Sequence, residues 1–240
     1  KFDILGLRTL SVIYDVCDSL KLDPDDIPLD DKKIFKPLRK GFNCPHGLFQ
    51  LEADTNYKVC KKVAPDSLEG LSAVVAIGRP GALEFLDSYA VYASTGEAQT
   101  VHPFFDSVLS YTGGIPLYQE QLMKMAVKVG FSLDESEQLR RIVGKKKVEE
   151  MPKWKSQIEQ KVIEKNLPHE VGDVLWSVAE DSANYSFNKS HSLSYATLAA
   201  WTIYLKFKYP LEFFLSLLKM SKFEPSPFDE ISKISQELAH

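Results

Sequence analysis

The sequence predicts a mainly α-helical protein with a few short strands. Apolar residues recur at helical spacing along most of the chain; Leu10, Ile13, Tyr14 and Cys17 follow the i, i+3, i+4, i+7 pattern. Glycines, prolines and capping residues divide this pattern into segments. The alternation of strands and helices that is typical of a parallel sheet is not visible. At 240 residues, one large domain or two small ones are expected.

Prolines and glycines separate the elements of the first half. Pro65 and the run Gly78–Gly81 interrupt the helical pattern. The segment 48–51 is flanked by Pro45 and Gly47, which fits a strand or a turn. Helices are expected over 5–20, 30–40, 52–63, 67–77 and 80–94.

The second half carries clearer start and stop signals. Tyr111–Gly114 predicts a turn, and Gly130 closes the helix that follows it. Ser132, with Glu135 three residues later, has the pattern of a capping box for the next helix. Helices are expected over 117–129, 132–144, 148–165, from Pro168 onward, 192–208 and 211–221.

Composition argues against several classes of protein. Hydrophobic residues make up 44% and charged residues 26% of the chain, which is typical of globular proteins. A net charge of -4 and a pI near 5.8 argue against a protein that coats nucleic acid. No apolar run approaches the roughly 18–20 residues that a membrane span requires. A membrane is therefore not an expected partner.

The cysteines and the first residues indicate compartment and context. Cys17, Cys44 and Cys60 are odd in number and form no CxxC pair, so neither a disulfide framework nor a zinc site is expected. Reduced thiols in the cytoplasm are the default. The chain opens without an initiator methionine or a signal peptide, so we expect a fragment of a longer chain.

A basic segment contrasts with the acidic total. From Arg140 to Lys165 nine basic residues face four acidic ones, a local net charge of +5. Cations at a helix C-terminus complement the helix dipole and can be simply solvated. Alternatively they form a phosphate site, because guanidinium and ammonium groups converge at one helix end. The candidates are Arg140, Arg141, Lys145, Lys146 and Lys147.

A second polar block, residues 184–192, precedes the most apolar expected helix. Asn188 or Ser190 could cap that helix, and Tyr185 with Phe187 could belong to the core. The alternative is a nucleotide pocket with an aromatic face for the base. Its donors to sugar or phosphate would be Asn188, Lys189 and His191.

Two further acidic positions are ambiguous. Asp3 lies in an alternating segment that could end a strand, where a carboxylate can ligate Mg²⁺, although a lone Asp is more often a cap or a surface residue. Glu120 lies in Tyr118–Gln121 near an expected helix start, and the helix dipole explains an acidic residue there.

In chain order, eight blocks resemble the C-family bacterial DNA polymerase III alpha subunit, in its DnaE-type branch. Each block alone is a weak signal, but together they span nearly the whole sequence. They are KFDILGLRTL (1–10), IPLDDKKIF (27–35), FQLE (49–52), GRPG (78–81), LYQEQLM (117–123), LRRIVGKKKVEEM (139–151), YSFNKSHSLSYA (185–196) and YLKFKYPLEFF (204–214).

The resemblance implies a domain organisation and an activity. Residues 1–6 would be the last strand of the palm, 7–222 the fingers domain, and 223–240 a linker and the start of the next region. The full-length protein would be a DNA-directed DNA polymerase, and the fragment alone would be inactive. Implied partners are template–primer DNA, the incoming deoxynucleoside triphosphate (dNTP), and in the full protein the sliding clamp and other replisome subunits.

The resemblance also assigns roles to residues. Asp3 matches a palm carboxylate of a two-metal Mg²⁺ site whose other aspartates lie outside this chain, and Lys1 matches a nearby palm lysine, so both are expected to be catalytic. The nucleotide-binding residues implied by the matching blocks are Arg79, Arg140, Arg141, Lys145, Lys146, Lys147, Tyr185, Asn188, Lys189 and His191.

Several positions depart from the family pattern, and among them Ile142 and Val143 replace a smaller pair. Ser186 stands where the family usually has glycine, which leaves the backbone path there open, and Ala53 and Ala82 replace a usual serine and proline. These departures suggest a divergent member, such as a phage-encoded one. The alternative hypothesis is a non-catalytic helical module related to the fingers, which binds nucleic acid or a protein partner.

Overall fold

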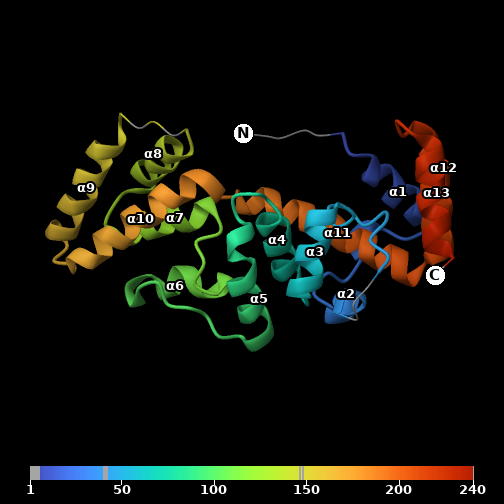
Figure 1. Ribbon diagram of the computed structural model, residues 1–240, viewed down its shortest axis with the longest axis horizontal. Coiled ribbons are helices and arrows are strands. Elements are labelled where there is room, and N and C mark those ends of the chain that lie inside the picture. The colour runs from blue at the N-terminus through green and yellow to red at the C-terminus, as the bar shows by residue number, and fades with distance from the viewer. Residues whose placement is uncertain (1–5, 40–42, 146, 148, 240) are drawn as a thin grey trace. The chain divides into compact units, whose positions relative to one another are not determined.

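The computed structural model describes residues 6–39, 43–145, 147 and 149–239, and it confirms a mainly helical fold (Figure 1). Within these residues the only extended pairing is an isolated parallel bridge between Tyr118 and Phe187. The few short strands of the prediction are thus reduced to one bridge. The expected palm strand at 1–6 lies outside the described residues, apart from Gly6.

The chain divides into two compact units. Unit 1 contains the residues up to Val75 and those from Leu193 onward, and unit 2 contains Ala76–Ser192. The division falls inside two helices, α4 (Leu68–Ile77) and α11 (Lys189–Lys208).

In unit 1 the first helix, α1, packs against α12, which lies near the end of the chain. The buried face of α1 consists of Val12, Ile13, Val16 and Cys17, whereas Tyr14, expected on that face, is exposed. The remaining parts are short 3₁₀ helices and α helices. Besides its parts of α4 and α11, unit 1 contains α1 (Arg8–Leu20), α2 (Lys36–Arg39), α3 (Asp54–Val63), α12 (Pro210–Met220) and α13 (Pro227–Leu238), with 3₁₀ turns at Pro24–Asp26, Lys32–Phe35 and Ser221–Phe223.

The segment expected to be a linker at 223–240 is largely helical. Pro227 lies in the first turn of α13, where backbone N–H groups have no partner within the helix, so the missing N–H of proline costs no hydrogen bond. α13 packs against α12. The Glu237 carboxylate accepts hydrogen bonds from the His46 N–H and the buried Lys206 ammonium. Burial lowers the pKa of Lys206. The domain boundary proposed at 223 stays a prediction.

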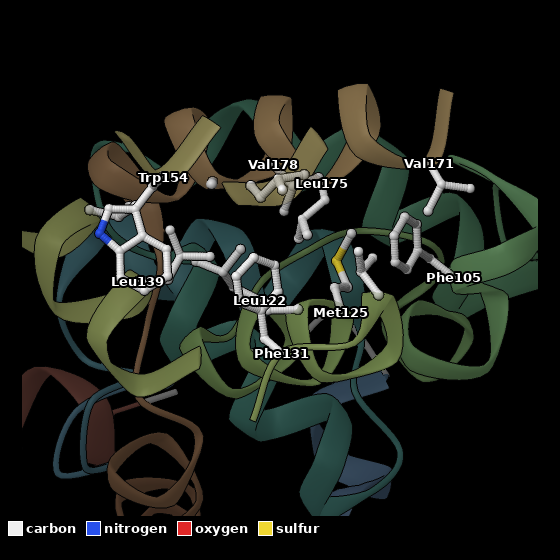
Figure 2. Close-up of a cluster of buried hydrophobic side chains, with 14 of the residues drawn as sticks. Phe105, Leu122, Met125, Phe131, Leu139, Trp154, Val171, Leu175 and Val178 are labelled. Atoms are coloured by element: carbon white, nitrogen blue, oxygen red, sulfur yellow. The ribbon is translucent and has the colours of Figure 1, made fainter. Parts of the chain in front are cut away.

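Four helices enclose the core of unit 2. Figure 2 shows side chains such as Leu122, Leu139, Trp154 and Leu175, which come from α7, α8, α9 and α10 in turn. Each of these four side chains is at most 6% exposed, so their burial is the main stabilising term of the unit. The helices of unit 2 are α5 (Leu86–Thr95), α6 (Asp106–Leu109), α7 (Gln119–Val129), α8 (Leu133–Gly144), α9 (Met151–Glu164) and α10 (His169–Tyr185).

Local signals placed most of these boundaries correctly. Ser132 and Glu135 form the predicted capping box, with the Ser132 N–H 2.6 Å from Glu135 Oε2. Gly130 ends α7 at a φ of 122°. The segment 48–51 is a turn, and short helices fill 103–112, where no element was expected.

The three cysteines are free thiols. Cys17 and Cys60 are buried, and burial raises the pKa of Cys60 to about 12. Of the helices that the structure describes, none is both long and apolar enough to span a bilayer.

Candidate functional site

The two polar segments singled out in the sequence meet at one pocket of unit 2. The pocket has a volume of about 120 Å³. Arg140 and Gly144 reach it from the end of α8, and Gln119 reaches it from the start of α7. The last turn of α10 and the residue after it, Ser182–Ser186, complete the wall. Segments far apart in sequence thus face one small cavity.

Arg140 is held in place by neighbours on two helices. Its Nε and Nη2 donate to the two carboxylate oxygens of Glu137 at 2.7 and 2.6 Å, and its Nη1 donates to Gln119 Oε1 at 3.1 Å. The hydrogen bond with Glu137 raises the pKa of Arg140. The guanidinium is therefore oriented before any ligand arrives.

Glu137 serves both arginines of the basic segment. Arg141 Nε donates to its Oε1 at 2.8 Å. The hydrogen bond from Arg140 is the main cause that lowers the pKa of the Glu137 carboxyl to about 2. Sequence reasoning did not select Glu137, although a glutamate three and four residues before two arginines is a recognised pairing on a helix.

The other cations of 140–147 that the structure describes do not line the pocket. Arg141 and Lys145 are exposed at the end of α8, and Lys147 pairs with Glu150 at 2.6 Å. Lys146 lies outside the described residues. Among the predicted cations of 140–147 that the structure describes, Arg140 alone lines the pocket.

The aromatic residues of the second segment have different environments. Tyr185 is half-buried, lines the pocket, and meets the Phe85 ring edge-on at 4.6 Å. Burial raises the pKa of its phenol. Phe187 is only 5% exposed, and the Arg79 guanidinium lies 4.0 Å from its ring centre. Phe187 is therefore a core residue, and of these two rings only Tyr185 lines the pocket.

Asn188 is the N-cap that the sequence suggested as one alternative. Its Oδ1 accepts from the His191 N–H at 2.8 Å and from Ser190 Oγ at 2.7 Å. With Asn188 as its cap, α11 begins at Lys189, three residues before the expected start at 192. His191 packs near Phe187, with 5.7 Å between ring centres.

Lys189 and Arg79 each contact aromatic rings. The Lys189 ammonium lies 4.4 Å from the centre of the Tyr111 ring and 5.7 Å from that of Tyr118. Such contacts orient a cation by the negative face of a ring. Arg79 is exposed and covers Phe187. Neither residue lines the pocket that contains Arg140.

The start of α7 joins the two segments, which the sequence did not reveal. The Gln119 N–H donates to the Phe187 carbonyl at 2.8 Å, and the Phe187 N–H donates to the Leu117 carbonyl at 3.2 Å. Glu120 accepts from Asn188 Nδ2 at 2.9 Å and from the Lys189 N–H at 3.0 Å. Explaining Glu120 by the dipole of its own helix was incomplete, because its carboxylate reaches α11.

Of two small residues near the pocket, Gly81 and Ser186, only Gly81 meets a backbone constraint. A Cβ on Gly81 would lie 2.5 Å from the Asn184 carbonyl oxygen, so this glycine permits close approach of two backbones. Ser186 has φ -61° and ψ 129°, a conformation open to any residue. The serine in place of the family glycine therefore requires no special backbone path.

The expected metal site is not represented in the described part of the chain. Among those residues no group of three or more His, Cys, Asp or Glu side chains is arranged to hold a metal ion. Asp3 and Lys1, the expected catalytic residues, lie outside the described residues.

Comparisons with known proteins match this chain to one family. The family model of the bacterial DNA polymerase III alpha subunit finger domain matches residues 9–166. The DNA polymerase III alpha subunit of Aquifex aeolicus is 38% identical over 233 residues, covering 92% of this chain and 20% of that protein. Those of Thermus aquaticus and Escherichia coli K12 are each 36% identical, covering 99% and 91% of this chain and 20% of each relative. The chain thus spans about a fifth of the length of these relatives. It belongs to the bacterial DNA polymerase III alpha subunit finger-domain family.

Proposed function

We propose that this chain is the fingers region of a DNA-directed DNA polymerase and that unit 2 binds the phosphates of the incoming dNTP. The observation that carries the proposal is the pocket in which an oriented Arg140 faces the 182–186 segment. A guanidinium suits phosphate oxygens because its donors form a planar fork. Tyr185, on the same wall, would offer an aromatic face to the base.

The exposed cations would act at longer range. Arg141, Lys145 and Lys147 are exposed, so they suit steering of the triphosphate or of template–primer DNA better than fixed contacts. Lys146, although outside the described residues, is assigned the same role on the strength of the sequence block.

The remaining assigned residues would support the nucleotide from the α11 side. Lys189 and His191 lie in the first turn of α11, and Asn188 caps it. Arg79 would act through Phe187, whose ring it covers. We assign these residues to shaping the neighbourhood of the nucleotide.

The catalytic proposal rests on residues outside the described ranges. Asp3 would contribute one carboxylate to a Mg²⁺ site with palm aspartates from beyond this chain, and Lys1 would lie near the nucleotide phosphates. In the full-length protein, Asp3→Asn should abolish incorporation and leave DNA binding nearly intact. Unchanged incorporation would contradict the metal role.

The wider setting of the full-length protein is part of the same proposal. Because the chain is about 20% of its relatives' length, the fragment alone is proposed to be inactive. The sliding clamp and other replisome subunits are proposed partners of the full protein, in the cytoplasm.

The phosphate role can be tested by nucleotide incorporation in the full-length protein. Arg140→Ala should raise the apparent dNTP Kd at least about tenfold, since a charge-assisted contact contributes about 1.5–3 kcal/mol. Lys153→Ala is the matched control, because it removes one exposed cation of α9 that does not line the pocket. Equal Kd values for both variants would contradict a phosphate contact by Arg140.

A further inference from the structure

Three consecutive residues at the start of α7 each form hydrogen bonds with a different partner. The Gln119 side chain accepts from Arg140 of α8. The Glu120 carboxylate accepts from the cap and the first N–H of α11. Gln121 is completely buried; its Oε1 accepts from the Tyr118 N–H at 2.8 Å and its Nε2 donates to Thr112 Oγ1 at 2.7 Å. The buried glutamine thus fixes the backbone from which the other two side chains extend.

The Glu120 contact determines which way the Asn188 amide faces. An amide side chain has one acceptor oxygen and one donor nitrogen. Asn188 directs Nδ2 to the Glu120 carboxylate and Oδ1 to the His191 N–H. The reversed amide would place oxygen against carboxylate and NH₂ against N–H, and both pairs repel. Glu120 therefore selects the orientation in which Asn188 caps α11.

Glu120 also contacts the helix itself. Its Oε2 accepts from the Lys189 N–H, the first amide of α11, at 3.0 Å. A carboxylate at a helix N-terminus is stabilised by the positive end of the dipole. The two hydrogen bonds cross 68 and 69 residues of sequence, so they fix α11 to α7 rather than stabilising a local turn.

We propose that Glu120 is a positioning residue for the nucleotide site. It sets the first turn of α11, with Lys189 and His191, relative to the pocket that contains Arg140. This inference rests on the proposed nucleotide-binding function, and it gives the LYQEQ block a role that the sequence pattern alone did not supply.

Loss of Glu120 should alter placement more than folding. Asn188 still caps α11 through the His191 N–H, and its carbonyl still accepts from the Ser192 N–H at 3.0 Å. The helix therefore keeps cap bonds of its own. What disappears is the pair of hydrogen bonds by which Glu120 holds Asn188 and the Lys189 N–H.

The test uses full-length protein on primer–template DNA, with single-nucleotide incorporation measured before the steady state. Glu120→Ala should raise the dNTP Kd roughly tenfold and lower the rate at saturating dNTP by less than about twofold. Glu120→Gln should have an intermediate effect. Its amide oxygen can accept from the Lys189 N–H, but its NH₂ then opposes the NH₂ of Asn188.

Glu135→Ala is the matched structural control, because Glu135 closes the capping box of α8 and contacts no part of α11 that the structure describes. It removes a carboxylate at a helix start in the same unit. A Kd raised by Glu120→Ala and unchanged by Glu135→Ala supports positioning. A Kd that rises equally in both variants overturns it.

Two further variants separate this inference from the proposed function. If Arg140→Ala raises the dNTP Kd while Glu120→Ala matches Glu135→Ala, the phosphate site stands and the positioning role fails. If Arg140→Ala leaves the Kd unchanged, both fail. In a double-mutant cycle, Glu120→Ala and Asn188→Ala should be less than additive in their effect on Kd, because they remove the same contact. Full additivity contradicts the inference.

Discussion

The side chains of Arg140 and Gln119 meet across two helices: Nη1 of the arginine at the end of α8 lies 3.1 Å from Oε1 of the glutamine at the start of α7. The same Gln119 donates its N–H to the Phe187 carbonyl. Gln119 therefore forms hydrogen bonds both with the basic end of α8 and with the polar block 184–192. This arrangement turns two separate sequence patterns into one candidate site.

The Glu137 carboxylate should make stability depend on pH. Its pKa of about 2 in the folded state lies below the ordinary value near 4.3. Its contribution is therefore fully present above about pH 4.5 and lost as pH falls toward about 2. The carboxylate is partly exposed, so solvent screening limits the contribution to about 1 kcal/mol.

Unfolding of the 240-residue chain, measured against pH, checks this. Wild type should exceed Glu137→Gln in free energy of unfolding at pH 6, and the two curves should converge toward about pH 2. A constant difference across this range would assign the stability to packing and not to the charge.

Gly81 should tolerate no side chain. Alanine there would place its Cβ 2.5 Å from the Asn184 carbonyl oxygen, and the atoms of Asn184 and Tyr185 that it would meet are backbone atoms, which cannot rotate away. We expect Gly81→Ala to cost about 1–3 kcal/mol in free energy of unfolding. Gly144→Ala is the control, because a Cβ there meets nothing within 4 Å and alanine favours a helix. Similar denaturation midpoints for the two variants would refute the close approach.

The helix core of unit 2 should be sensitive to cavities. Leu175 is completely buried among α7, α8, α9 and α10 (Figure 2). Leu175→Ala should lower the free energy of unfolding by about 2–5 kcal/mol. Leu211 on α12 is 76% exposed, so the same truncation there should change it by less than about 0.5 kcal/mol. Denaturant titration compares the two directly, and equal losses would contradict the assigned core.

Ala53, which replaces the usual serine of the family, should lower the stability of the chain. Ala53 occupies the N-cap of α3 with φ -68° and ψ 132°, and it makes no side-chain cap bond. The serine that the family usually has would supply one, so Ala53→Ser should stabilise the chain by about 1 kcal/mol. Ala53→Val lacks a hydroxyl acceptor and should give no gain in thermal unfolding temperature. A rise with valine as large as that with serine would rule out capping as the cause.

Helix positions could be predicted because their signals are local. The capping box of Ser132 and Glu135 and the terminal Gly130 placed α7 and α8 within a few residues. α11 begins earlier than expected because Asn188 caps it through the His191 N–H. The contact of that cap with Glu120, 68 residues away, could not be read from the sequence. α13 was taken for a linker, since two prolines resemble a break, yet Pro227 suits a first helical turn.

Charge in the sequence selected Arg140 of the candidate site, but the sequence did not reveal the contacts of its side chain. The run 140–147 identified Arg140, whereas the side chains that orient it were missed, because the partner on α7 depends on tertiary packing. The residue pattern alone treated Tyr185 and Phe187 alike, and only the family resemblance selected Tyr185 for nucleotide binding. Their separate roles depend on burial, which places Phe187 beneath Arg79 and Tyr185 on the pocket wall.

The most direct test of the account is whether Arg140 recognises phosphate. In full-length protein bound to primer–template DNA, competition titration would give Kd values for a dNTP and for the matching deoxynucleoside. For Arg140→Ala, the account predicts a rise of at least about tenfold in the dNTP Kd and almost no change in the deoxynucleoside Kd. Equal losses for both ligands would contradict it, because the arginine would then support the pocket without contacting the phosphates.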